Sequence, residues 1–247
     1  MALKVFVDIE TLPPDERVAA KLRLENCVKI LANNGSKTAT QKLVSSIAED
    51  ISSYSVNALP DDLYRRLSLC GEYGRVLAIG VIIEKDGKVC RKGVFGYDPD
   101  KRRFHLDEAK TLRGFWKLIK NFNIEKDLII GHNLMDFDLP FLVKRSRITH
   151  TAPTVNFSFA RYRSQPIYDT MKEWSLWNTR ETFLSLMHLA ELLDIGISKT
   201  DGMDGSKVYD EFMNGSHELI HNYCLQDVEV TRAVFHRISS PELGLCP

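Results

Sequence analysis

The apolar positions of the chain gather in five short runs that are rich in β-branched and aromatic residues. These runs predict strands at Lys4–Thr11, Arg75–Ile83, Lys88–Tyr97, Asp127–Gly131 and Ile167–Thr170. The dipeptide Asp86-Gly87 separates the second run from the third and favours a two-residue hairpin turn. We therefore expect the first three strands to form an antiparallel meander.

Apolar residues at helical spacing lie between and after the predicted strands. They predict helices at 15–33, 38–53, 61–68, 106–122, from Pro140 onward, and at 181–193, 207–213 and 216–238. The order strand, strand, strand, helix, strand, helix is typical of an α/β fold, in which helices pack on a mixed sheet. Residues 13–74 then form a helical insertion between the first and second strands. Covering the core, guiding a substrate and building a dimer all stay open as its role.

Two carboxylates, Asp8 and Glu10, lie in the otherwise apolar first strand. Side chains two positions apart on a strand point to the same face, so these acids are expected side by side. Two like charges held that close disfavour ionisation of both unless a cation lies between them. The strand therefore indicates either a metal site or an exposed strand end with solvated acids.

The last predicted helix carries Asp227 within its apolar stripe. A carboxylate on a face that packs on the core is costly unless it is paired or binds a metal. Tyr223 lies one turn earlier, so its hydroxyl and the Asp227 carboxylate can converge on one point. A buried Asp that bonds to a helix cap, with Tyr223 as ordinary core, is the alternative interpretation.

A third acidic position, Asp138, lies where a buried strand leads into the helix that begins near Pro140. Carboxylates at such a junction also act as helix caps, a role that suits Asp136.

The most basic stretch follows at 144–163, where Arg161, Tyr162 and other cations and aromatics alternate. Such a mixture is typical of a surface that follows a phosphate backbone and stacks bases, and equally of an ordinary solvated loop.

Composition narrows the choice of function only slightly. The 247 residues contain 33 Lys and Arg and 33 Asp and Glu, so any basic surface must be local. Five cysteines without a paired CxxC motif favour a reducing compartment and argue against zinc. No leader segment is recognisable, and no apolar run approaches the roughly 18 residues of a membrane span. We expect a cytoplasmic protein with no membrane partner.

Taken together, the acidic positions carry a resemblance to the DEDD superfamily of 3′-to-5′ exonucleases. The three motifs read Asp8-Ile-Glu10, Asn133-Leu-Met-Asp-Phe137-Asp138 and Tyr223-Cys-Leu-Gln-Asp227. The third motif resembles that of the tyrosine subclass. The histidine subclass places its catalytic His five residues before the Asp, where this chain has Asn222, so the neighbouring His221 is rejected as a catalytic residue. Residues 3–11 and about 75–238, with Asp-Gly-Ser-Lys-Val-Tyr-Asp at 204–210, are similar to stand-alone exonucleases related to the family-B polymerase proofreading domain.

The resemblance implies a single exonuclease domain over 1–247, with a ribonuclease-H-like, mixed five-stranded sheet flanked by helices. It also implies two divalent cations, and oxygen ligands favour Mg²⁺ or Mn²⁺. By resemblance Asp8, Glu10 and Asp227 hold the first ion, Asp8 bridges to the second, and Asp138 supports the second. Tyr223 is expected to orient the attacking water.

The implied substrate is the 3′ end of single-stranded DNA or RNA, released as nucleoside 5′-monophosphates. Asn133 and Phe137 match positions that meet the terminal nucleotide, and Thr11 and Leu12 are expected to line the same pocket. Asp169 is expected to be structural. A proofreading role needs a separate polymerase or repair partner. The alternatives are a non-catalytic nucleic-acid-binding or scaffolding module with this fold, and a ribonuclease-H-like endonuclease.

Overall fold

The computed structural model describes residues 2–15, 61–178, 183–196 and 202–239. The chain divides into two compact units, the first made of 1–10 and 76–247 and the second of 11–75. The second unit nearly coincides with the predicted insertion 13–74. The helices predicted at 15–33 and 38–53 lie, apart from Asp15, outside the described residues. A single domain over 1–247 stays a prediction.

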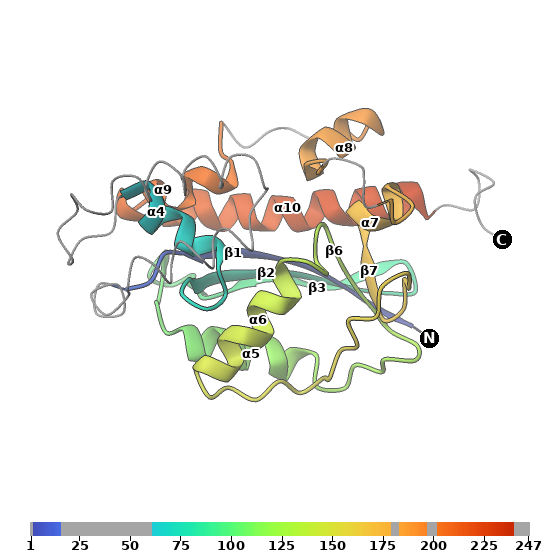
Figure 1. The fold of residues 1–247 in the computed structure, drawn as a ribbon, viewed down its shortest axis with the longest axis horizontal. Coiled ribbons are helices and arrows are strands. Elements are labelled where there is room, and N and C mark those ends of the chain that lie inside the picture. The colour runs from blue at the N-terminus through green and yellow to red at the C-terminus, as the bar shows by residue number, and fades with distance from the viewer. Residues whose placement is uncertain (1, 16–60, 179–182, 197–201, 240–247) are drawn as a thin grey trace, which may run out of the picture. The chain divides into compact units, whose positions relative to one another are not determined.

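A mixed five-stranded sheet forms the centre of the first unit (Figure 1). Its strands are β1 (Leu3–Leu12), β2 (Arg75–Lys85), β3 (Lys88–Phe95), β6 (Leu128–Gly131) and β7 (Ile167–Asp169). Their order is β3-β2-β1-β6-β7, with β1, β6 and β7 parallel and β2 antiparallel to β3. The predicted mixed sheet is confirmed, with the acidic strand β1 at its middle.

The β2–β3 hairpin has the predicted turn, because Asp86 and Gly87 both have positive φ, 52° and 75°. The strand predicted to continue to Tyr97 is interrupted at Gly96. A Cβ on this glycine would lie 2.3 Å from the Leu77 carbonyl oxygen, and its φ is 96°. The chain then forms a separate two-stranded sheet of β4 (Tyr97–Asp98) and β5 (Arg103–Phe104), which the sequence pattern did not predict.

Helices cover both faces of the sheet, α5 (Glu108–Leu118) and α6 (Asp138–Ile148) on one and α10 (His217–Ile238) on the other (Figure 1). Alternate residues of β1 pack into apolar cores on opposite faces of the sheet. Val5, Val7 and Ile9 pack with α5 and α6. Phe6 packs with Val228 of α10. Burying one such side chain contributes about 1.5–3 kcal/mol. The alternation that buries these residues therefore turns the next even-numbered positions of β1 toward α10.

Shorter helices are also present in the described parts of the two units. They are α4 (Asp61–Arg66) and the 3₁₀ turn η1 (Leu67–Leu69) in the second unit, and α7 (Thr170–Trp174), α8 (Leu186–Leu192), η2 (Gly205–Lys207) and α9 (Val208–Met213) in the first. The helix predicted at 181–193 is shorter because Ser185 caps α8, its hydroxyl accepting from the His188 amide. The Asp107 carboxylate likewise starts α5 later than predicted, by accepting from the Lys110 amide. None of the helices described here is long and apolar enough to cross a bilayer.

A buried ion pair joins α5 to α6. The Arg145 Nε and Nη2 atoms donate to the two Glu108 oxygens at 2.9 and 2.8 Å, and the Val76 amide donates to Glu108 Oε1 at 2.8 Å. Arg145 is only 7% exposed. This basic residue of the stretch 144–163 is therefore part of the core and not of a nucleic-acid surface.

We expect Glu108→Ala to lower the free energy of unfolding by about 3–5 kcal/mol, because a buried guanidinium loses its carboxylate. The melting temperature should fall by about 10 °C. Thermal unfolding followed by circular dichroism measures this, with exposed Glu125→Ala as the matched control. Equal melting temperatures for the two variants would contradict the assignment.

Candidate active site

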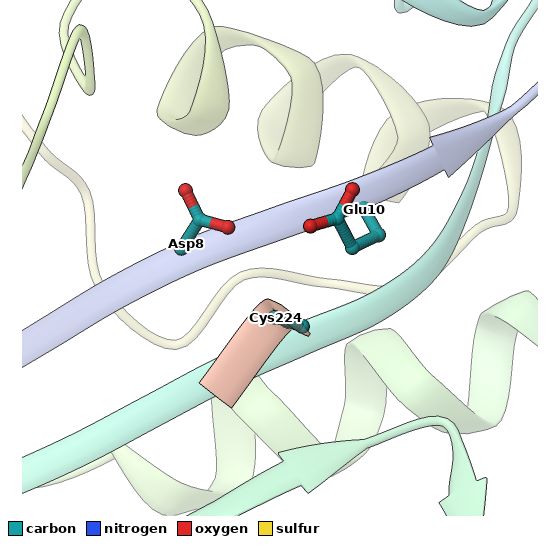
Figure 2. Close-up of side chains that lie close together, drawn as sticks. All are labelled: Asp8, Glu10 and Cys224. Carbon is teal, nitrogen blue, oxygen red and sulfur yellow. The ribbon is translucent and has the colours of Figure 1, made fainter. Parts of the chain in front are cut away.

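Strand β1 presents Asp8 and Glu10 side by side on the face that α10 covers (Figure 2). Cys224 of α10 lies beside them. One carboxylate oxygen from each acid and the Cys224 Sγ all lie within 4.8 Å of one another. Glu10 is 6% exposed and Asp8 is half-buried, so the exposed strand end with solvated acids is excluded.

Asp138 joins this pair from the first turn of α6. Its Oδ1 accepts a hydrogen bond from the Ile9 amide at 3.1 Å, and the residue is 3% exposed. The parallel pairing of β1 with β6 ends at Phe6, so the Ile9 amide lies beyond the ladder and is available to a side chain. A helix N-terminus also favours a negative charge. The bond fixes Asp138 to the backbone between Asp8 and Glu10.

Asp136, expected as a helix cap, has a different contact. Its carboxylate forms an ion pair with Lys172 Nζ at 2.5 Å. The N-cap residue of α6 is Phe137, which makes no side-chain capping bond.

Helix α10 brings Asp227 near this pair, close enough for its charge to raise the pKa of Asp8 and Glu10. In the described part of the chain, only Asp8, Glu10 and Cys224 have donor atoms that all lie within 4.8 Å of one another, so Asp138 and Asp227 border this group. A glycine in β2 allows this helix to approach closely, because a Cβ on Gly80 would lie 2.8 Å from Val228 Cγ2 and 2.9 Å from Cys224 Sγ. The Tyr223 hydroxyl donates a hydrogen bond to the Asp227 carboxylate one turn later. Tyr223 therefore belongs to the acidic cluster and is not ordinary core.

The four carboxylates oppose one another's ionisation. Burial raises the pKa of Asp8 well above its ordinary value, and the charges of Asp138, Asp227 and Glu10 raise it further. Burial, Asp227 and Asp138 raise the pKa of Glu10 in the same way. Burial also raises the pKa of Asp138 to about 7 and that of Asp227 to about 6. A cluster of this kind is stabilised by cations that neutralise its charge.

The donor set fits hard divalent cations. Four carboxylates supply only oxygen ligands, which suit Mg²⁺ and Mn²⁺. Burial and the neighbouring acids raise the pKa of the Cys224 thiol well above its ordinary value, so it stays protonated and is a poor ligand for such ions. The sequence analysis gave Cys224 no role, although its place three residues before Asp227, on the same side of a helix, indicates that it borders the cluster.

The segment before Asp138 is held by Asp169, at the end of β7. The Asp169 carboxylate accepts from the Asn133 amide at 3.0 Å and from the Met135 amide at 2.9 Å. It also accepts from the amides that begin α7. This is the structural role that the sequence predicted. Asn133 has a φ of 59° and is half-buried, so the hydrogen bonds of Asp169 hold its backbone in the left-handed region.

The remaining predicted substrate residues differ in exposure. Phe137 is half-buried and packs on the core beside Phe141, with ring centroids 5.6 Å apart. Thr11 and Leu12 follow Glu10 in β1 and belong to the second unit, where Thr11 is half-buried and Leu12 is 1% exposed.

His221, rejected as a catalytic residue, stacks on Tyr97 with ring centroids 4.4 Å apart.

We expect Asp227→Asn to stabilise the metal-free protein at neutral pH. Burial raises the pKa of Asp227 to about 6, so the folded protein keeps a proton that the unfolded chain loses near pH 4. The wild-type carboxylate therefore lowers folding stability as the pH rises from about 4 to 6, by at most about 3 kcal/mol. Asparagine has the same shape and does not ionise.

Melting temperatures in EDTA at pH 4.5 and pH 7.5 measure this effect. The variant should melt about 5 °C above the wild type at pH 7.5 and close to it at pH 4.5. The same difference at both pH values would contradict the raised pKa. Adding Mg²⁺ or Mn²⁺ at pH 7.5 should stabilise the wild type more than the variant.

Comparison with protein families gives one match, which covers well over half of the chain. Residues 69–243 match a family described as a predicted 3′-5′ exonuclease related to the exonuclease domain of PolB. The matched range includes Asp138, Tyr223 and Asp227, whereas Asp8 and Glu10 precede it. Comparison with curated proteins finds no matching relative.

Proposed function

The chain belongs to the family of predicted 3′-5′ exonucleases related to the exonuclease domain of PolB, and on that premise we propose that it is an active, metal-dependent exonuclease. Its substrate is the 3′ end of single-stranded DNA or RNA, and its products are nucleoside 5′-monophosphates. The observation that carries this proposal is the cluster of Asp8, Glu10, Asp138 and Asp227. Three segments far apart in the sequence bring these acids close enough to raise one another's pKa.

The four carboxylates are proposed to hold two divalent cations, the type of cofactor that exonucleases of this kind generally use. Asp8, Glu10 and Asp227 would hold the first ion, and Asp8 together with Asp138 would hold the second, Asp138 directly or through water. When bound, such ions stabilise the negative charge that develops on the attacking and leaving oxygens of a phosphodiester. This arrangement also explains why the chain keeps four acids whose mutual repulsion destabilises the metal-free fold.

Tyr223 is proposed to orient the attacking water. Burial and the neighbouring acids raise the pKa of its hydroxyl above the ordinary value, so the group stays protonated at neutral pH. A protonated hydroxyl holds a water by hydrogen bonding and does not remove its proton. Its bond to Asp227 fixes the direction of the phenol relative to the acids.

Asn133 and Phe137 are proposed to meet the terminal nucleotide, since the segment that carries them leads directly into Asp138. The Asn133 side chain supplies hydrogen bonds, and the half-buried Phe137 ring supplies an apolar surface. Thr11 and Leu12 complete the proposed set of substrate residues by their place directly after Glu10 in β1.

Cleavage of 5′-labelled single-stranded DNA and RNA oligonucleotides with Mg²⁺ or Mn²⁺ tests the proposal, with Asp8→Ala as the control. The expected result is a ladder that shortens from the 3′ end and is absent in the control. Intact strands that nevertheless bind the protein would overturn the proposal and favour a non-catalytic binding module. Cleavage of a circular strand would instead indicate an endonuclease.

A further inference from the structure

A cavity of about 380 Å³ adjoins the segment that leads into Asp138. Its size lies within the range of small-molecule sites. Its lining includes Asn133, Arg161, Tyr162, Lys172, Trp177 and Phe183, together with one acid, Asp136. Asn133 connects the cavity to the acidic cluster, because the short segment 133–138 begins at the cavity and ends at Asp138.

Aromatic side chains give the cavity a stacking surface. Tyr162 is 68% exposed and Phe183 is 66% exposed, so both rings are accessible to a ligand. The Tyr162 and Trp177 rings lie 5.5 Å apart between centroids. The Trp177 indole donates to Glu173 Oε1 at 3.1 Å and packs on the core, so this part of the surface is anchored.

Cations stand beside these rings. Arg161 is exposed next to Tyr162, and Lys172 lies on α7 in an ion pair with Asp136. A guanidinium and an ammonium beside aromatic rings suit a ligand that has a flat base and a negatively charged backbone. The cavity therefore matches a nucleotide better than a purely apolar molecule.

The backbone around the cavity is held in a rare conformation. Asn133, Tyr162 and Trp177 all have positive φ, at 59°, 62° and 59°. Asn tolerates this left-handed region, but it is unfavourable for bulky residues such as Tyr162 and Trp177, so the surrounding structure must hold their backbone in place. The Trp177 amide, which donates to the Lys172 carbonyl at 2.9 Å, helps to hold this geometry.

We propose that this cavity receives an unpaired nucleobase of the substrate strand close to the cleaved phosphate. The base stacks on Tyr162, Trp177 and Phe183, while Arg161 and Lys172 contact its phosphates. A base that is still paired in a duplex cannot stack in this way, so the cavity makes the enzyme select single-stranded ends. This inference rests on the proposed exonuclease function and extends it to the strand beyond the removed nucleotide.

Binding of a labelled oligothymidylate to the full chain carrying Asp8→Ala, in Mg²⁺, tests the cavity without cleavage. In this background Tyr162→Leu should weaken binding about tenfold or more, and Tyr162→Phe should bind like the parent, because only the ring stacks. Arg161→Gln should weaken binding and reduce its salt dependence, whereas exposed Arg147→Gln, outside the cavity, should not. Abasic sites near the 3′ end should weaken parent binding and reduce the effect of Tyr162→Leu.

The outcomes separate this inference from the exonuclease proposal. If the wild type cleaves but Tyr162→Leu and the abasic strand bind as tightly as their parents, the cavity inference is overturned and the exonuclease proposal stands. If the wild type does not cleave but binding still depends on the base and on the Tyr162 ring, the cavity binds bases and hydrolysis is overturned. Tyr162 is largely exposed, so its variants should fold, which circular dichroism checks.

Discussion

Asp8→Asn is expected to abolish cleavage, with kcat reduced by about 1000-fold or more. Asp8 lies at the centre of the acidic cluster, where Asp138, Asp227 and Glu10 all raise its pKa. The proposal also assigns it to both cations, so the loss of one charge affects both. Asparagine keeps the shape of the side chain and removes only the charge that a divalent cation needs.

Rates with a 5′-labelled oligonucleotide in Mg²⁺ and in Mn²⁺ measure this loss, and exposed Asp100→Asn is the control that should retain full activity. The melting temperature in EDTA separates loss of the site from loss of the fold. Removing one of several repelling charges should leave the variant at least as stable as the wild type. A wild-type rate for Asp8→Asn would remove Asp8 from the mechanism.

The acidic strand shows what alternation alone can predict. Val5, Val7 and Ile9 have to face one core, so the acids at Asp8 and Glu10 have to face the other side. The stripe of α10 similarly places Tyr223 and Asp227 on one surface, and the order of elements predicts the mixed sheet. These features follow from the periods of strand and helix, which a single sequence displays.

Other parts of the site depend on contacts that no local pattern shows. The bond from the Ile9 amide to Asp138 exists because β6 stops pairing at Phe6, a register set by the whole sheet. In the basic stretch 144–163, Arg145 is buried because it donates hydrogen bonds to Glu108 of another helix, whereas Arg161 is exposed.

The aromatic lining of the cavity likewise could not be predicted from the sequence. Trp177 and Phe183 belong to no motif, and only the fold brings them to Tyr162 and Asn133. Long-range pairing, and not the composition of any single segment, therefore decides which of the polar and aromatic candidates become part of a site.

Tyr223→Phe is expected to lower kcat by about 10- to 100-fold, with a smaller change in KM. The phenyl ring keeps the packing of Tyr223, and only the hydroxyl that donates to Asp227 is lost. The water then loses an orienting group, while the acids that hold the cations remain. The loss should therefore be smaller than that of Asp8→Asn.

The pH dependence of the rate separates an orienting hydroxyl from a general base. Because the pKa of Tyr223 is raised, its hydroxyl is protonated throughout pH 6–9 and contributes no limb to the profile in that range. Tyr223→Phe should therefore lower the whole profile without changing its shape. Tyr97→Phe is the control, because the Tyr97 hydroxyl interacts with Arg102 and not with the acids. This variant should leave the rate and the pH profile unchanged. A basic limb that disappears in Tyr223→Phe would make Tyr223 the base, and a wild-type rate would exclude it from the mechanism.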